Sequence, residues 1–412
     1  MARVVYISYD GMAEQLGQSQ VLPYVRGLGK RGHQIELLSF EKPPEPLVFR
    51  RPIAEGVRWT SLRYHRTPTV PATSFDLVQG QATLALLDAL AGGVDLLHVR
   101  SYVPCLMALA WSKLRRVPLL FDTRGTWPDQ KVAAGTWSAT GRLYRGTKRV
   151  ERTLYARADY ITVLTNAYAE YLRRDYPHAA EVRAPIAVIP TCVDLDTFSV
   201  EGPATLRDET CRTLVYVGSL GGVYLDEAIG RFYLAFRRRV GKARLLVVSK
   251  QAPTAIAAVL GDAAGELVHR GARHDEVPGY LRSADAAVSL IGEGFGFLGS
   301  APTKLGEMLA CGLPVAATPL GDVVNLLDQS GAGVVVRDVG QAGIEAAAEE
   351  LVRLMNERTT RATARRLAER WFSLARAVDA YDEIYHSIVE GGALSGNWPD
   401  QRWPTDRWPT DR

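Results

Sequence analysis

Short apolar runs alternate with helical patterns over most of the chain. In the first half the apolar runs are RVVYISYD, HQIELLSF, VDLLHVRS, VPLLFDTRG, ADYITVLTN and IAVIPT, and helical segments such as QSQVLPYVRGLGKRG lie between them. Strands that alternate with helices are typical of parallel β-α-β units, in which helices cover both faces of the sheet. The pattern therefore predicts an α/β fold with an open, doubly wound parallel sheet.

A second series of the same kind begins at RTLVYVGSL, continues through ARLLVVSK, ELVHRG, DAAVSLIG and LPVAATP, and ends near GAGVVVRD. Residues 193–211 between the two series are polar and carry turn residues, so we interpret them as an interdomain linker. We predict two Rossmann-like domains, residues 1–193 and 194–371, that face each other across a cleft, with residues 372–390 packing back on the first. Their ligands should bind at the carboxyl ends of the strands.

Length and charge agree with this organisation. A chain of 412 residues is too long for one ordinary core. The formal net charge of +4 is too small to indicate nucleic acid as a partner. The last residues, 391–412, repeat the unit W-P-x-x-R three times, and we expect this tail to be disordered because such a unit cannot bury a core.

The four cysteines contain no C-x-x-C pair, which favours reduced thiols over a zinc site or disulfides. The first residues, MARVVYISYDG, resemble a β-strand more than a signal peptide, and no apolar run approaches the length of a membrane span. We therefore expect a cytoplasmic protein, in contact with a membrane at most from its inner face.

A glycine-rich stretch in the second half has two interpretations. It contains a literal G-x-G-x-x-G at Gly294, Gly296 and Gly299, which is the fingerprint of dinucleotide sites. That fingerprint needs its third glycine inside the following helix. Here the next helix can begin only near Pro302 or Thr303, so we favour a different site.

The same helix start suits a phosphate group. Pro302 at the first helical position and Ser300 just before it favour a helix N-terminus, which presents free N–H groups and the positive end of the helix dipole. Lys304 in the first turn opposes that dipole, and a bound diphosphate would remove the conflict. Glu307, one turn later, could accept two hydrogen bonds from a ribose diol. The alternative is a capped helix whose Lys and Glu face solvent.

The stretch SAPTKLGEMLACGLPVAATPLGD resembles the donor site of family 4 glycosyltransferases, which are retaining enzymes with the two-domain GT-B fold. The similarity extends in order through GMAEQLGQSQVLPYVRGLGKRGHQIELLSF, FDTRGTWPDQKVAAGTW, ADYITVLTNAYAEYLRR, VIPTCVDLDTF and LVYVGSLGGVYLDEAI, from about residue 3 to 390. It implies a glycosyltransferase that moves a sugar from a nucleoside diphosphate sugar to a hydroxyl acceptor. The acceptor would be a saccharide or a lipid-linked saccharide in cell-envelope or exopolysaccharide assembly, and no metal or cofactor is expected.

In this family the glutamate of the E-M-L-A-C-G-x-P-V segment binds the donor ribose, which assigns that role to Glu307. The usual second glutamate, eight residues earlier, is Gly299 here. The contact with the transferred sugar would therefore come from Ser300, Thr303 or the backbone. Glu293 imitates the missing acid but would fit only with an insertion.

Two glycine loops complete the predicted donor site. The loop from Gly218 to Tyr224 lacks the Arg and Lys with which many relatives hold the diphosphate. Gly218 and Ser219 would then only allow close approach, and Lys304 would supply the positive charge. In the first domain the family brings the loop that contains Gly17 to the diphosphate and the acceptor, although an ordinary strand-to-helix turn would look the same.

Asp122 and Arg124 follow a strand end where many relatives have a histidine that contacts the reacting sugar. Asp122 could orient a sugar hydroxyl or stabilise positive charge at the anomeric carbon, and Arg124 could position it or bind an anionic acceptor. A structural Asp–Arg pair is the alternative. His98 and Arg100 close another strand and are secondary candidates.

Two further patterns have competing interpretations. The sequence DLD at residues 194–196 imitates a metal-binding D-x-D, but relatives have a similar turn there, so we expect no metal. Residues 141–159 set basic side chains beside Leu143, Tyr144, Leu154 and Tyr155, which indicates either contact with anionic lipid or a solvated helix face. The alternatives to a transferase are a sugar-nucleotide epimerase of the same two-domain plan and a non-catalytic sugar-nucleotide-binding subunit.

Overall fold

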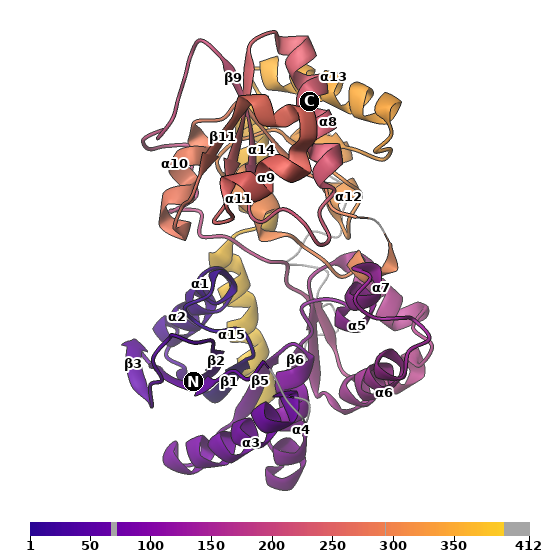
Figure 1. Cartoon of the computed structure of the whole chain (residues 1–412). Helices are drawn as coiled ribbons and strands as arrows, with labels where there is room; N and C mark the ends of the chain where they lie inside the picture. The colour runs from indigo at the N-terminus through magenta and orange to yellow at the C-terminus, as the bar shows by residue number, and fades with distance from the viewer. Residues whose placement is uncertain (67–71, 293, 391–412) are drawn as a thin grey trace. The chain divides into compact units, whose positions relative to one another are not determined.

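The structure is a computed structural model that describes residues 1–66, 72–292 and 294–390. The predicted disordered tail, residues 391–412, and Glu293 lie outside this part of the chain. The described chain divides into two compact units (Figure 1). Unit 1 comprises Met1–Pro190 and the segment that begins at Leu374, and unit 2 comprises Thr191–Ser373.

Unit 1 is built on an eight-stranded sheet in the order β3-β4-β2-β1-β5-β6-β7-β8. Its strands are β1 (Arg3–Ser8), β2 (Gln34–Glu41), β3 (Arg51–Ala54), β4 (Val57–Arg63), β5 (Leu96–Arg100), β6 (Leu119–Asp122), β7 (Tyr160–Val163) and β8 (Ile186–Val188). Its helices are α1 (Gln15–Gln20), α2 (Leu22–Lys30), α3 (Ala72–Leu90), α4 (Tyr102–Arg115), α5 (Trp127–Ala133), α6 (Arg142–Arg157), α7 (Asn166–Arg174), α15 (Leu374–Glu390) and the short η1 (Ala179–Glu181).

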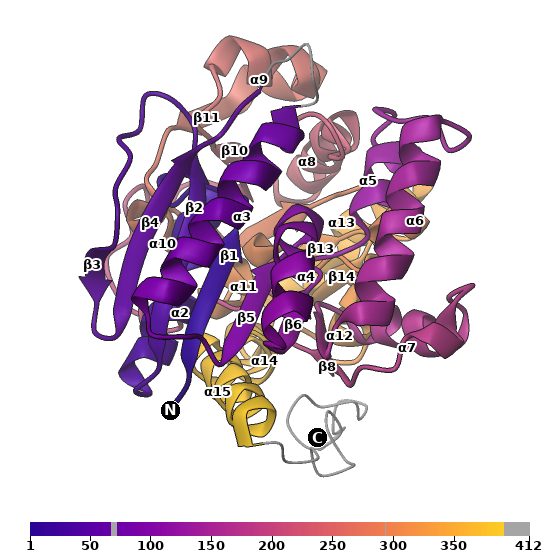
Figure 2. The ribbon, with the colours of Figure 1, turned by 90° about the horizontal axis from the view of Figure 1, so that it is seen from below.

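All strand pairs of this sheet are parallel except β3 with β4. Helices α3, α4 and α6 pack on one side of the sheet, and α2 and α15 pack together on the other (Figure 2). The central strands are therefore covered on both sides, which explains why their sequences are continuous apolar runs. The parallel core of the predicted sheet is confirmed.

Two local features of unit 1 differ from the sequence prediction. The hairpin β3–β4 was missed, because Pro52 weakens the strand pattern and is accepted only at an edge. The helix predicted over QSQVLPYVRGLGKRG is broken at Val21, where α1 ends and α2 begins. Ser19 lies inside α1 and donates to the carbonyl oxygen of Gln15 at 2.8 Å, so it forms no helix cap.

Unit 2 contains a six-stranded, all-parallel sheet in the order β11-β10-β9-β12-β13-β14. Its strands are β9 (Arg212–Val217), β10 (Ala243–Val248), β11 (Leu267–Arg270), β12 (Ala286–Ser289), β13 (Val315–Ala317) and β14 (Gly333–Val335). Its helices are α8 (Asp226–Val240), α9 (Pro253–Leu260), α10 (Val277–Arg282), α11 (Thr303–Ala310), α12 (Val323–Asp328), α13 (Gln341–Asn356) and α14 (Thr360–Trp371), with short turns η2 (Gly261–Glu266), η3 (His274–Glu276) and η4 (Phe295–Phe297).

Side chains that alternate along β9 enter two separate cores. Val215 and Val217 pack with α10, α11, α12 and α14, whereas Leu214 and Tyr216 pack with α8, α9 and α13. This alternation follows from the two-residue period of a strand. Both faces of the sheet are thereby buried.

The segment interpreted as a linker is packed on unit 2. Val193 and Phe198 are buried in its core, and the Arg365 guanidinium donates to the carbonyl oxygens of Leu195 and Phe198. The chain changes units at Pro190/Thr191 and returns at Ser373/Leu374. Turn residues in the sequence therefore marked an irregular segment correctly but did not show that it is docked.

Within the described ranges, none of the helices combines the length and the apolar character needed to cross a bilayer.

Candidate functional site

The strand order of unit 2 reverses between β9 and β12, which is where open α/β sheets bind ligands. The loops that leave these two strands are joined at the reversal. Tyr224 forms an isolated antiparallel bridge with Ile291, and the Gly292 amide donates to the carbonyl oxygen of Val223 at 2.8 Å. The glycine-rich loop after β9 and the segment that leads to α11 thus form one surface.

Lys304 reaches this surface from the first turn of α11. Its ammonium nitrogen lies 3.3 Å from the Tyr216 hydroxyl, 4.5 Å from the Tyr216 ring centre and 4.0 Å from the Tyr224 ring centre. The residue is 9% exposed. A cation enclosed by two aromatic faces is attracted by both rings but lacks a full anionic partner.

Electrostatics in the site are dominated by burial. Burial lowers the pKa of Lys304 to about 7, although the carboxylates of Glu307 and Asp226 act in the opposite direction. Burial likewise raises the pKa of Glu307 to about 7, against the effect of Lys304. Groups whose pKa values are moved this far toward neutrality are concentrated at functional sites.

Glu307 lies one helical turn beyond Lys304 and is 6% exposed. No residue of the described chain donates a hydrogen bond to its carboxylate; the nearest cationic candidate is His274, whose Nδ1 lies 3.9 Å from Oε1. Burial lowers the pKa of His274, so the imidazole is mostly neutral near pH 7. A buried carboxylate with unused acceptor capacity suits a ligand that brings hydroxyl donors.

The loop after β9 is shaped for close approach. Gly218 has φ +112°, and a Cβ atom there would lie 3.1 Å from the Lys304 ammonium. The Tyr216 hydroxyl donates to the carbonyl oxygen of Ser219 at 2.6 Å. Gln251 holds the next residue, because its side chain accepts from the Leu220 amide at 2.6 Å and donates to the Leu220 carbonyl at 2.9 Å.

The start of α11 differs by one residue from the prediction. The helix begins at Thr303, and Pro302 is the N-cap with extended ψ of 124°, a position that its fixed φ also allows. Pro302 and not Ser300 occupies the N-cap position, so the helix start predicted from Ser300 and Pro302 is displaced. Ser300 and Thr303, which precede Lys304 in the sequence, are half-buried. Their contact with a donor sugar stays a prediction.

In unit 1 the strand order reverses between β1 and β5. Gly17 lies in α1, and a Cβ atom there would approach the Gly11 carbonyl oxygen to 2.1 Å. The buried Glu41 carboxylate accepts from the Met12 amide at 2.6 Å and from the Ala13 amide at 3.3 Å. Close packing therefore already requires glycine at position 17, and a donor contact there stays a prediction.

Asp122 ends β6 and is 2% exposed. It accepts from the Thr162 hydroxyl at 3.1 Å and lies 3.6 Å from the Arg124 guanidinium and 3.9 Å from His98 Nε2. Burial alone would raise its pKa, but Arg124 and His98 outweigh burial and hold it below the usual value. The His98 Nδ1 lies 2.6 Å from the Tyr385 hydroxyl of α15. The structure thus contains the Asp122–Arg124 ion pair. Direct contact of either residue with a substrate stays a prediction.

The reversal in unit 1 also gathers residues that the sequence reasoning did not combine. The amide oxygen of Gln20 accepts from Arg100 at 2.7 Å and from Arg124 at 3.0 Å, and Arg100 also pairs with Asp10. The backbone is strained at two positions in this group: φ is +74° at Ser101, which follows Arg100, and +57° at Arg124 itself. Non-glycine residues held in such conformations cluster at functional sites.

The basic segment 141–159 contains helix α6. Leu154 and Tyr155 are buried in unit 1, and Tyr144 donates to Asp129 at 2.7 Å. Only Leu143, 61% exposed, remains as a large apolar side chain facing outward. The predicted amphipathic surface is therefore mainly a basic face whose apolar side serves the core.

Asp194 shows why DLD is a poor metal motif here. Its carboxylate accepts from the Asp196 amide at 3.0 Å and from the Thr197 hydroxyl at 2.9 Å, which closes a local turn. The described residues contain one group with possible ligand atoms within 4.8 Å of one another, namely His33, Asp382 and His386. His33 Nδ1 accepts from the Ala2 amide at 3.0 Å, which places the proton on Nε2 toward Asp382 at 2.7 Å. Hydrogen bonds thus account for this group.

Sequence reasoning missed Tyr216, Tyr224 and His274 as members of the candidate site. Tyr216 carried no signal because it lies in an apolar strand. Tyr224 ends the glycine loop that lacks the Arg and Lys of many relatives. Its place in that loop was the one sequence signal that could have assigned it to the site.

Two protein-family sequence models match the chain, one mainly over unit 1 and the other within unit 2. Residues 18–197 match the sequence model of Glycosyltransferase Family 4, and residues 211–357 match that of Glycosyl transferases group 1. No curated protein sequence matches the chain.

Solved structures resemble the whole chain. Sucrose-phosphate synthase from Thermosynechococcus elongatus is 16% identical, with 95% of this chain and 100% of that chain covered and a TM-score of 0.71. WaaG, a glycosyltransferase involved in lipopolysaccharide biosynthesis, is 16% identical over 93% and 99%, with a TM-score of 0.67. Anabaena HepE in complex with UDP and glucose is 12% identical over 94% and 100%, with a TM-score of 0.65. At these identities the likeness is one of fold, and it confirms the predicted GT-B class with two Rossmann-like parallel sheets.

Proposed function

The chain belongs to glycosyltransferase family 4, and on this premise we propose that it transfers a sugar, with retention of configuration, from a nucleoside diphosphate sugar to a hydroxyl acceptor. Nucleotide-sugar glycosyltransferase activity follows from the family. The stereochemistry, the residue roles and the acceptor are our proposals. The observation that carries them is the buried pair Lys304 and Glu307, one helical turn apart at the point where the strand order of unit 2 reverses.

We assign the donor diphosphate to the side of Lys304. The ammonium lies beside the glycine loop and in the first turn of α11, so a diphosphate there would meet a cation and the positive end of the helix dipole together. Gly218 and Ser219 would allow its approach. The complexes of HepE with UDP-glucose and of a starch synthase with ADP support a nucleotide-containing ligand for this chain.

We assign the ribose to Glu307, whose carboxylate has unused acceptor capacity. The distance of one helical turn between Lys304 and Glu307 is about 5 Å, which matches the short span from a diphosphate to the diol of its ribose. With Gly299 in place of an acid, the transferred sugar would be held by Ser300, Thr303 and the backbone.

In the reaction the bond between the anomeric carbon and the diphosphate oxygen breaks, and a bond from the acceptor oxygen to that carbon forms on the same face. The acceptor proton passes to the departing diphosphate. Lys304 and the helix amides would stabilise the negative charge that builds there, the kind of preorganised electrostatics that usually contributes most to catalysis.

In unit 1 we propose that Asp122 and Arg124 act near the anomeric carbon and that the loop with Gly17 approaches the donor. The shared bond of Arg100 and Arg124 to Gln20 supports a fixed cationic surface there. Because Asp122 is buried, we favour a role in positioning Arg124. We propose no metal in the reaction, since the carboxylate of Asp194 closes a local turn by accepting from the Asp196 amide and the Thr197 hydroxyl.

We propose a saccharide or lipid-linked saccharide as acceptor, in cell-envelope or exopolysaccharide assembly at the inner face of a membrane. The distribution of charge supports this location. Residues 1–190 and 374–390 hold more Lys and Arg than Asp and Glu, whereas residues 191–373 hold slightly fewer. Unit 1 is thus the basic part of the molecule.

A panel of UDP-, GDP- and ADP-sugars tests the proposal. We expect one nucleotide class to raise the melting temperature of the wild type, and the matching sugar to be transferred when membrane extract is added. Glu307→Gln should weaken binding of that nucleotide. Undiminished binding by Glu307→Gln, or no binding of any nucleotide sugar by the wild type, would contradict the assignment.

A further inference from the structure

Helix α3 presents an apolar stripe to the outside. Phe75, Val78, Leu86 and Leu90 are 57%, 68%, 47% and 45% exposed, and their spacing places them on one side of the helix. The charged residues of α3 are Asp76 and Asp88, and both are buried. The outward face therefore carries no charge at all, although single exposed apolar residues would be ordinary.

Helix α4 packs beside α3 (Figures 1 and 2) and carries a further exposed leucine. The Arg115 guanidinium lies 3.2 Å from Asp88, which joins the last turns of the two helices. Leu114 is 73% exposed, and its sequence neighbours Lys113, Arg115 and Arg116 are exposed as well. In the described structure neither Lys113 nor Arg116 forms an ion pair. The last turns of α3 and α4 thus bring exposed cations to the same end of unit 1 as Leu86 and Leu90.

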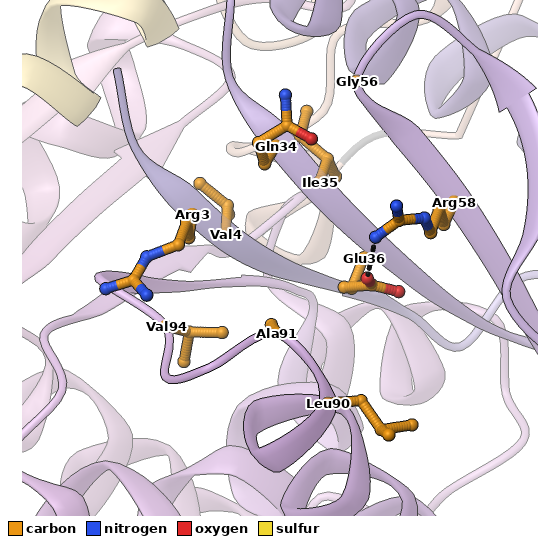
Figure 3. Close-up of a pocket in the computed structure, with 10 residues that line it drawn as sticks. All are labelled: Arg3, Val4, Gln34, Ile35, Glu36, Gly56, Arg58, Leu90, Ala91 and Val94. Atoms are coloured by element: carbon orange, nitrogen blue, oxygen red, sulfur yellow. Dashed lines mark hydrogen bonds and ion pairs between the residues drawn. The ribbon is translucent and has the colours of Figure 1, made fainter.

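A small cavity adjoins this end of α3. Figure 3 shows Leu90, Ala91 and Val94 across from β1 and β2, with Arg3 and Arg58 at the rim. Its volume is about 150 Å³, below the usual range for a ligand site. We therefore regard it as a hollow at the border of the stripe and not as a separate binding site.

We propose that the α3 face, defined as Phe75, Val78, Leu86, Leu90 and Leu114 with Lys113 and Arg116, docks unit 1 on an anionic lipid bilayer. Apolar side chains beside cations are suited to the boundary between acyl chains and anionic headgroups. The basic excess of unit 1 acts in the same direction. If two copies of the chain paired through the α3 face, Lys113 and Arg116 of both copies would approach each other and would need anionic groups to compensate them.

The α3 face is distinct from the basic helix α6 and from the donor site, and the proposal does not rest on the transfer reaction. It has a geometric link to the carboxyl edge of the sheet. The Tyr9 hydroxyl, in the loop after β1, donates to Asp76 in the first turns of α3 at 2.6 Å. Docking through α3 would therefore hold this loop at a fixed position relative to the membrane.

Vesicle flotation of the full chain tests the proposal. We compare vesicles of phosphatidylcholine alone with vesicles that contain phosphatidylglycerol. Wild type should float with the anionic vesicles and much less with the neutral ones. The double variant Val78→Glu/Leu86→Glu should bind the anionic vesicles at least about tenfold more weakly, since removal of one buried aliphatic group alone costs about tenfold.

Leu143→Glu is the matched control, because the exposure of Leu143, on the basic face of α6, lies between those of Leu86 and Val78. It should float like the wild type. The milder pair Val78→Ser/Leu86→Ser, with circular dichroism on every variant, separates loss of docking from loss of folding. Lys113→Gln/Arg116→Gln should weaken binding to anionic vesicles several-fold.

Two results would overturn the proposal. Wild type could fail to float with anionic vesicles, or Leu143→Glu could lose as much binding as the α3 variants. If a wild type that fails to float is dimeric by light scattering and Val78→Glu/Leu86→Glu is monomeric, the α3 face is an interface between copies.

Discussion

The ammonium of Lys304 lies 4.0 Å from the ring centre of Tyr224, and the lysine itself is buried. Lowering its pKa from 10.5 to about 7 corresponds to a cost on the order of 5 kcal/mol for the charged form. Cation–π attraction in a desolvated site contributes about 2 kcal/mol. The rings therefore offset only part of the cost, and a diphosphate would supply the rest.

This imbalance predicts that donor binding depends on pH. The pKa of Lys304 in the folded protein is lower than in the unfolded chain, so the free site loses its cation as pH rises through about 7. A bound diphosphate would restore the proton. Glu307, whose pKa is also about 7, gains its negative charge over the same range and acts in the opposite direction at the ribose. The diphosphate is charged and the ribose is not, so we expect the loss of the Lys304 cation to dominate. Affinity for a nucleoside diphosphate sugar should therefore fall several-fold from pH 6.5 to 8.5, with proton uptake by Lys304 on binding.

Calorimetry in two buffers of different ionisation enthalpy measures that uptake. Lys304→Met should bind the donor about tenfold or more weakly, since charged hydrogen bonds contribute about 1.5–3 kcal/mol. It should also lose most of the pH dependence. Lys242→Met, at an exposed lysine at the amino end of β10, is the control. An affinity of the wild type that is constant over this pH range would contradict the prediction.

Gly218 allows a test with a control inside the same loop. Gly218 and Gly221 have φ of +112° and +91°, so alanine strains the backbone at either position by about 1–3 kcal/mol. Only at Gly218 would the new methyl group meet the Lys304 ammonium, at 3.1 Å; at Gly221 it would meet open space.

We therefore expect both alanine variants to lower the melting temperature by a similar amount. Gly218→Ala should in addition raise the KM for the donor, about tenfold, whereas Gly221→Ala should leave it nearly unchanged. Kinetics with the donor varied at saturating acceptor measure this difference. Equal effects on KM would show that the glycines serve the loop conformation only.

The two tyrosines should contribute in different ways. Tyr224→Leu removes a ring that faces the ammonium, so it should weaken donor binding several-fold, whereas Tyr224→Phe keeps the ring and should bind normally. Tyr216→Phe removes the hydroxyl that donates to the Ser219 carbonyl at 2.6 Å and should mainly lower the melting temperature. Nucleotide titrations and melting curves of the three variants distinguish these effects; a loss of binding in Tyr224→Phe would argue against attraction by the ring.

Glu307 should discriminate ribose from deoxyribose. If its carboxylate accepts from the ribose hydroxyls, the wild type should bind a 2′-deoxy donor about tenfold more weakly than the ribo donor. Glu307→Gln should bind both donors weakly and with little difference between them. Competition binding measures the ratio, and unchanged discrimination in Glu307→Gln would place the ribose elsewhere.

The sequence predicted the larger organisation well because parallel strands buried on both faces leave continuous apolar runs. Strands such as Leu119–Asp122 and Ala286–Ser289 lie inside runs that were recognised. The hairpin of β3 and β4 was missed, because an edge strand with proline and arginine lacks that signature. Phe198 in turn shows that a polar, turn-rich stretch can still be anchored by one buried aromatic residue.

Within the candidate site, sequence distance limited what was predictable. Lys304 and Glu307 were recognised because they lie one turn apart on a single helix. Tyr216 reaches Lys304 only through the pairing of β9 with β12, and His274 reaches Glu307 from the loop after β11. Contacts of this kind depend on strand order, which the apolar pattern does not specify.

Substitution of Asp122 tests whether this carboxylate has a structural or a catalytic role in unit 1. Its carboxylate lies 3.6 Å from the buried Arg124 guanidinium, so Asp122→Asn should leave that guanidinium poorly compensated and destabilise the protein by about 3–5 kcal/mol. The lowered pKa adds a signature in pH. Its stabilising contribution is fully present above the ordinary pKa of an aspartate, near 4, and is lost as pH falls below it.

The free energy of unfolding should therefore decrease less steeply with falling pH in Asp122→Asn than in the wild type. Denaturant unfolding from pH 3 to 7 measures both effects, with Asp196→Asn, at an exposed aspartate of unit 2, as the control. If Asp122→Asn instead unfolds like the wild type while kcat falls sharply, the carboxylate acts on the reacting sugar and is not primarily the anchor of Arg124.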